Sequence, residues 1–224
     1  MGGPVLGVLG LGGRVPSEPT VRRLVSTLDA AALLALFGAR AQVRWTAAGG
    51  RRVVAIDGKT VRGAKNGPKG APRLVVATTH DSGLVVGQVQ VGAKTNETPA
   101  ARDLLALFDL EGVVVTLDAM HTQTETAWLI TALGGDYVLT VKGNQPGLRD
   151  DLAALPWRDV PGLALTERGH VGTVTRTVKA LVKPAWIEFP GCSQVLRIRR
   201  ATTVRGKRTV EIVYLICSAT MEDA

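Results

Sequence analysis

Two aspartates, Asp57 and Asp118, each follow a short apolar run that is rich in β-branched residues. Residues 53–56 and 113–117 are too few for helices and are typical of buried strands. Because groups at the carboxyl ends of neighbouring strands point into a shared crevice, we expect the two carboxylates to face one another. Like charges so close are costly unless a cation lies between them, and such hard oxygen ligands suit Mg²⁺ or Mn²⁺. This chemistry supports phosphodiester cleavage and transfer.

Each aspartate also has a purely structural interpretation, as a turn residue whose side chain bonds to backbone amides. Two acids at matching strand ends favour the metal site. The flanking residues agree with a metal site. Asp57 precedes Gly58 and Lys59, which permit a tight turn with a cation close by, and Asp118 precedes residues 119–121 (AMH), which leave room beside the acid.

The elements that position these acids follow one order along the chain. After the strand at 53–56, a hairpin is expected from strands at 74–79 and 84–91, and helices are expected at 96–110, 122–133 and 145–155. The strand at 113–117 and another at 137–141 must cross over helices to join the sheet in parallel. The prediction is an α/β fold with a ribonuclease-H-like mixed sheet of three antiparallel and two parallel strands.

Four regions are predicted. Residues 1–15 are a ragged N-terminus, and residues 16–48 form a helical segment that we interpret as packing helices rather than as a DNA-binding element. Residues 49–156 form the core, and residues 157–224 form a β-rich unit with strand-like runs at 173–182, 194–203 and 209–217.

Charge and composition limit the partners. The 224 residues include 27 Lys and Arg against 19 Asp and Glu, with a pI near 10.0, which favours an anionic partner such as nucleic acid. The spacing of Cys192 and Cys217, and of the three histidines, does not indicate a zinc site. We expect a reducing compartment and no membrane span.

Residues 55–63 (AIDGKTVRG), 94–100 (KTNETPA), 116–123 (TLDAMHTQ) and 136–146 (DYVLTVKGNQP) resemble DDE transposases of the branch that includes the H-repeat-associated proteins. The resemblance implies cleavage and strand transfer of double-stranded DNA at insertion-sequence ends with Mg²⁺ or Mn²⁺, in which Asp57 and Asp118 are the first two acids. It also implies a homo-oligomer in the bacterial cytoplasm, associated with the nucleoid.

Three basic residues are expected to contact DNA, namely Lys59, Arg62 and Lys142. Lys142 follows the fifth strand, at the same sheet edge as the acids, although a solvated turn lysine is an equal alternative. His121 and Gln123 could line the crevice, but a helix N-terminus also favours polar side chains, and we interpret both as structural.

The sequence departs from the family pattern in two ways. The resemblance implies a third acid, a Glu on a helix after the β-rich insertion, and we expect this helix to be missing, so that the chain is an incomplete or inactive transposase. Val174 also stands where an acid is expected, with Glu167 as a substitute candidate. Alternatively, a carboxylate such as Glu97, Glu125 or Glu167 completes an active site, or the protein is a non-catalytic DNA-binding remnant or regulator.

Overall fold

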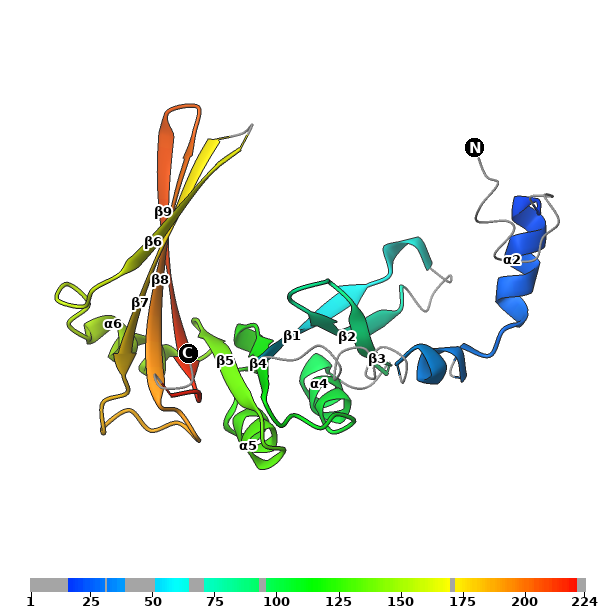
Figure 1. Ribbon diagram of the computed structural model, residues 1–224, viewed down its shortest axis with the longest axis horizontal. Coiled ribbons are helices and arrows are strands. Elements are labelled where there is room, and N and C mark those ends of the chain that lie inside the picture. The colour runs from blue at the N-terminus through cyan, green and yellow to red at the C-terminus, as the bar shows by residue number, and fades with distance from the viewer. Residues whose placement is uncertain are drawn as a thin grey trace.

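The computed structural model describes residues 16–30, 32–38, 51–64, 71–92, 96–169 and 172–220. The ragged N-terminus predicted for residues 1–15 lies outside this part. In the described residues nine strands form one sheet in the order β3-β2-β1-β4-β5-β9-β8-β7-β6 (Figure 1). The first five strands are β1 (Arg52–Thr60), β2 (Arg73–Thr79), β3 (Val85–Gln90), β4 (Val113–Leu117) and β5 (Asp136–Val141).

The pairing of these five strands confirms the predicted ribonuclease-H-like order. β1 pairs antiparallel with β2, and β2 pairs antiparallel with β3. β4 lies parallel to both β1 and β5, as crossover connections through helices require. The carboxyl ends of β1, β4 and β5 therefore lie at one end of the sheet.

β1 is longer than predicted, and this corrects the position of its acid. The strand was expected to end at Asp57, but it continues to Thr60 because residues 57–60 pair with residues 73–76 of β2. This pairing supplies hydrogen-bond partners to a polar stretch that has no strand-like hydrophobic pattern of its own. Asp57 is thus held by a paired backbone rather than by a turn.

Two helices cover one face of this sheet (Figure 1). Helix α4 (Glu97–Leu105) buries Ala100, Ala101, Leu104 and Leu105, and helix α5 (Thr124–Ala132) buries Ala127 and Ile130. They pack on the side chains of β1, β4 and β5 that point to this face, which are every second residue of each strand. These include Val54, Ile56, Val115, Leu117, Tyr137 and Leu139. Both helices begin and end inside their predicted ranges, as does α6 (Pro146–Ala154).

The C-terminal strands continue the core sheet. β6 (Leu163–Gly169), β7 (Gly172–Val182), β8 (Gln194–Val204) and β9 (Lys207–Cys217) pair antiparallel in turn, and β9 pairs antiparallel with β5. The β-rich unit therefore joins the core directly, and its long strands extend away from it (Figure 1). β6 was not foreseen, because every one of its residues is exposed and its apolar alternation is limited to Leu163 and Leu165 at its start.

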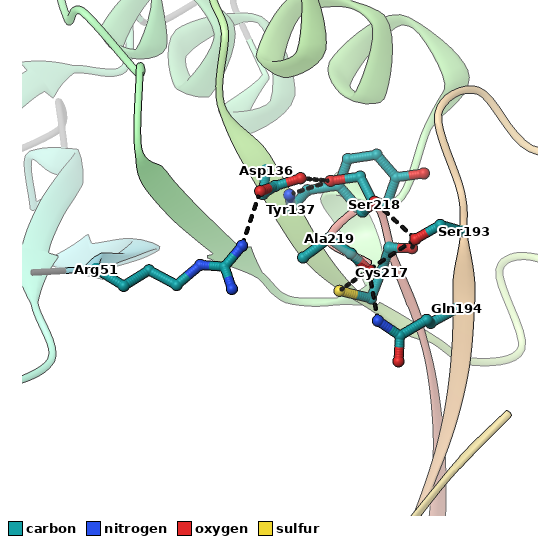
Figure 2. A network of polar contacts seen from close by, with 8 residues as sticks. All are labelled: Arg51, Asp136, Tyr137, Ser193, Gln194, Cys217, Ser218 and Ala219. Atoms are coloured by element: carbon teal, nitrogen blue, oxygen red, sulfur yellow. Dashed lines mark hydrogen bonds and ion pairs between the residues drawn. The ribbon is translucent and has the colours of Figure 1, made fainter. Parts of the chain in front are cut away.

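A polar network fixes β9 to the start of β5 (Figure 2). Ser218 donates its hydroxyl to Asp136 at 2.7 Å and accepts the Tyr137 amide at 2.8 Å. Asp136 also forms an ion pair with Arg51 at 3.1 Å. Gln194, at the start of β8, donates its side-chain amide to the carbonyl of Ala219 at 2.5 Å. These bonds lie at the opposite end of β5 from the two acids.

The N-terminal helix does not pack as expected. α2 (Glu18–Thr27) has no buried residue, and its apolar side chains Val21, Leu24 and Val25 are exposed. Residues 32–38 are also helical. α2 therefore does not pack against the rest of the described protein, and the interpretation of residues 16–48 as packing helices stays a prediction.

Among the described helices, none combines the length and the apolar character that a membrane span needs. Cys192 and Cys217 are both free and buried.

Candidate metal and DNA site

Asp57 and Asp118 line the same cavity, as their strand positions predict. The cavity has a volume of about 340 Å³, and the register of its strands places its lining residues Ala55, Thr116 and Val138 on the sheet face opposite α4 and α5. Its walls come from four strands: Ala55, Ile56, Asp57, Thr116, Leu117, Asp118, Val138, Thr140 and Leu215. Both aspartates are exposed. Their carboxylates are therefore accessible to solvent cations and to a bound phosphate.

The backbone after Asp118 forms a short 3₁₀ turn, Ala119–His121. One carboxylate oxygen of Asp118 accepts the Met120 amide at 3.2 Å, so the acid caps this turn. The other carboxylate oxygen accepts no hydrogen bond from this turn. The backbone of this turn thus orients the Asp118 side chain. Asp118 can therefore be a turn residue and a metal ligand at the same time.

The segment after β5 is tied to this turn by side-chain hydrogen bonds. Asn144 donates to the carbonyl of Ala119, and Gln145 donates to the carbonyl of Thr122 at 3.0 Å. Thr122 is fully buried and donates to the carbonyl of Thr140 at 2.6 Å. Thr122, Asn144 and Gln145 belong to the segments that resemble transposases, and their hydrogen bonds connect the segments that follow β4 and β5. Lys142 remains exposed at this end of the sheet.

Two further basic residues lie on or just after β1. The Lys59 ammonium forms an ion pair with Asp57, which shows that a cation can approach this carboxylate. Arg62 lies in the 3₁₀ turn Arg62–Ala64, and the structure describes only its backbone. Lys59 therefore lies beside Asp57, and Lys142 lies just after β5 at the same end of the sheet; their contact with DNA stays a prediction.

Glu97 is the third carboxylate that the fold brings to this region. It lies in the first turn of α4 and is half-buried. Its side chain packs against Gly58, between Asp57 and Lys59, so closely that a β-carbon at position 58 would lie 2.9 Å from Glu97 Cδ. The absence of a side chain at position 58 is thus what admits the Glu97 carboxylate.

His121 is buried beside these acids. Only 1% of its surface is exposed, and neither ring nitrogen has a hydrogen-bond partner among the described residues. Burial lowers the pKa of His121, whereas the nearby carboxylates of Asp118, Glu97 and Asp57 act to raise it. The interpretation of His121 as an ordinary structural residue leaves its unpaired nitrogens unexplained, because buried polar atoms are normally hydrogen-bonded.

The other candidate acids lie elsewhere. Glu167 is on β6, at the far edge of the nine-stranded order, and forms an ion pair with Arg176 at 2.7 Å. Glu125 is exposed in the first turn of α5. Neither lines the cavity that contains Asp57 and Asp118, and Glu97 does not line it either. In the described part of the chain, no three His, Cys, Asp or Glu side chains converge closely enough to enclose a metal ion.

The sequence analysis named Glu97 only beside Glu125 and Glu167, and it singled out Glu167 as the candidate third acid. The spacing of 40 residues from Asp57 does not show that the two lie close in space. The one available signal was Gly58, because a glycine within a strand often marks a close approach of another group. The bridging roles of Thr122, Asn144 and Gln145 were not foreseen.

The chain belongs to the family described as Transposase DDE domain, whose model matches residues 48–222. This result confirms the predicted family.

Individual proteins with similar sequences include two that are named as putative transposases. A protein of Xanthobacter autotrophicus named "Uncharacterized protein in dhlA 3'region" is 34% identical over 96% of this chain and 76% of its own length. "Putative transposase YncI" of Escherichia coli O157:H7 is 41% identical over 58% of this chain and 34% of its own length. An H repeat-associated relative of E. coli K12, YhhI, is 34% identical over 58% of this chain and 35% of its own length. The chain thus spans about a third of the length of these two E. coli relatives.

Proposed function

We propose that this protein cleaves DNA and transfers DNA strands at the ends of an insertion sequence, with Mg²⁺ or Mn²⁺ held by Asp57 and Asp118. The observation that carries the proposal is the shared cavity at the carboxyl ends of β1 and β4, in a chain of the DDE family. Two accessible carboxylates, one on the paired strand β1 and one that directly follows β4, are the kind of ligands that bind these hard cations.

The residues of the site fit a divalent ion. The donors are carboxylate oxygens rather than sulfur, and Lys59 already forms an ion pair with Asp57, where a metal ion would give stronger neutralisation. A bound ion would polarise the scissile phosphate and assist deprotonation of the attacking hydroxyl. Glu97 is the third acid in this proposal. Glu97 does not line the cavity, but its packing on Gly58, next to Asp57, and its proximity to His121 support it over Glu167 and Glu125.

DNA contacts in the proposal come from the basic residues at the same end of the sheet. Lys59 and Lys142 are exposed there and can neutralise phosphates on either side of the cavity. Arg62 follows β1 and extends the same basic segment. We place the protein in the cytoplasm, on nucleoid DNA, and expect a homo-oligomer to join two insertion-sequence ends.

The test is cleavage of labelled duplex DNA that contains the borders of the insertion sequence around the gene. The wild-type protein should produce strand breaks with Mg²⁺ or Mn²⁺ and none in EDTA. Asp57→Asn and Asp118→Asn should each reduce cleavage by at least about 10²-fold, as is typical when a group at a reacting centre is lost or misplaced. Asp103→Asn, on the exposed side of α4, is the matched control and should cleave like the wild type. Cleavage that survives Asp118→Asn would refute the proposal.

A second candidate function is DNA binding without cleavage, by a regulator derived from a transposase. The net charge of +8 favours it, as does the lack of a converged three-acid cluster among the described residues. It predicts salt-dependent binding of the same duplex with no metal-dependent breaks. Asp57→Asn would then change the affinity only modestly, through the loss of one negative charge.

A further inference from the structure

The register of β6 to β9 separates charge between the two faces of the C-terminal sheet. Successive side chains of a strand point to opposite faces, and directly paired residues share a face. At the far end of the sheet, one face has an arginine at each edge and two threonines between them. This row runs across all four strands as Arg168, Thr173, Thr203 and Arg208.

The next two rows of this face continue the pattern toward the core. They contain Thr166, Thr175, Ala201 and Val210, and then Ala164, Thr177, Arg199 and Ile212. The three rows contain three arginines, five threonines and no acid. We call these twelve residues the arginine–threonine face.

The opposite face of the same strands has a different charge pattern. Two of its basic residues are accompanied by acids, since Arg176 forms an ion pair with Glu167 at 2.7 Å and Arg200 is paired in register with Glu211. This is also the face that leads to the metal cavity, because Leu215 of β9 lines the cavity and belongs to it. The arginine–threonine face therefore points away from the cavity side of the sheet.

The arginines of the arginine–threonine face are available to a partner. Arg168 and Arg208 are exposed and Arg199 is half-buried. None of the ion pairs formed between described residues involves these three side chains. Unopposed guanidinium groups with hydroxyl donors between them are the groups that contact DNA phosphates. Val210 and Ile212 add only an apolar border on β9.

The spacing of the edge arginines suits a duplex. Arg168 on β6 and Arg208 on β9 are separated by three strand spacings, or about 14 Å at about 4.8 Å each. The major groove of B-DNA is about 12 Å wide. Flexible arginines at these two edges can therefore reach phosphates on both sides of one groove.

We propose that the arginine–threonine face binds the phosphate backbone of duplex DNA, at a segment separate from the strand that is cleaved beside Asp57 and Asp118. This inference rests on the proposed function for its choice of DNA as the partner. It adds a second DNA contact surface on the other side of the sheet, which would hold the insertion-sequence end while its terminus occupies the cavity.

The test compares two triple variants of the full chain with the same loss of charge. One variant carries Arg168→Gln, Arg199→Gln and Arg208→Gln. The control carries Arg176→Gln, Arg200→Gln and Lys207→Gln on the opposite face of the same strands. Fluorescence anisotropy with a 30-base-pair duplex, between 50 and 200 mM salt, gives the slope of log K against log salt. Circular dichroism melting checks that both variants fold, and light scattering gives their oligomeric state.

The first variant should reduce the magnitude of this slope by about 2 to 3, since each lost phosphate contact contributes about 0.9, and should weaken binding at least tenfold. The control should change the slope by less than about 1. Equal effects in both variants, a larger effect in the control, or a change only in oligomeric state would each overturn the inference. A wild-type protein that binds DNA with this difference but makes no metal-dependent breaks would refute the proposed cleavage and leave the inference standing.

Discussion

Glu97 packs its carboxylate against the backbone of Gly58, the residue that follows Asp57 on β1. The contact joins the first turn of α4 to the strand that carries the first acid. It brings a third negative charge to the end of the sheet where Asp57 and Asp118 lie and where His121 is buried. Charges of one sign are brought together there at a cost to folding, which a bound cation would offset.

The first prediction concerns Gly58→Ala. The new β-carbon would collide with the Glu97 carboxyl group, which is the free end of a flexible side chain and can move aside. The free energy of unfolding should therefore fall by less than about 1 kcal/mol, while Mn²⁺ affinity should fall as much as it does in Glu97→Gln.

The double variant gives the sharper measurement. If Gly58→Ala acts by displacing Glu97, Gly58→Ala combined with Glu97→Gln should bind Mn²⁺ no more weakly than Glu97→Gln alone. Glu125→Gln is the control and should bind normally. Fully additive losses in the double variant would show that the two residues act independently.

The second prediction concerns the attachment of the C-terminal strands. The Tyr137 hydroxyl is buried and donates to the carbonyl of Pro190 at 2.5 Å, and burial raises the pKa of this tyrosine. Tyr137→Phe removes the donor and leaves a carbonyl without its partner. Stability should fall by about 1 to 2 kcal/mol, measured by urea unfolding. A variant as stable as the wild type would show that the bond contributes nothing net.

The third prediction concerns alkaline pH. Burial raises the pKa of the Cys192 thiol from 9.0 to about 11, so the unfolded chain releases this proton at a lower pH than the folded chain does. The contribution to stability is complete below pH 9 and is lost as the pH rises through 11, by about 3 kcal/mol in total.

Cys192→Ala should remove this part of the pH dependence. The difference in unfolding free energy between wild type and variant should be constant below pH 9 and should shift in favour of the variant between pH 9 and 11. A difference that stays constant across the whole range would contradict the assigned pKa.

The strands that carry the two acids were predictable because their signals are local. Buried runs of Val and Ile mark β1 and β4, and the turn at residues 80–83 marks the β2–β3 hairpin. The continuation of β1 beyond Asp57 was not predictable, since it depends on pairing with β2. β6 was missed for a similar reason, because backbone pairing with β7 alone holds its exposed residues.

The site was predictable in part. The placement of Asp57 and Asp118 at one end of the sheet followed from the topology. The position of Glu97, in contrast, depends on a tertiary contact between α4 and Gly58, which no periodic pattern in the sequence indicates. The same holds for the pairing of β9 with β5, which joins residues 73 to 79 positions apart in the chain.

The central claim is that Asp57 and Asp118 together hold a divalent ion. Titration of the purified protein with Mn²⁺, followed by electron paramagnetic resonance of the free ion, tests it without any need for DNA. The wild type should bind Mn²⁺, Asp57→Asn and Asp118→Asn should each weaken binding by at least about tenfold, or about 1.4 kcal/mol, and Asp103→Asn should bind like the wild type. Binding that is unchanged in both Asp57→Asn and Asp118→Asn would contradict the claim.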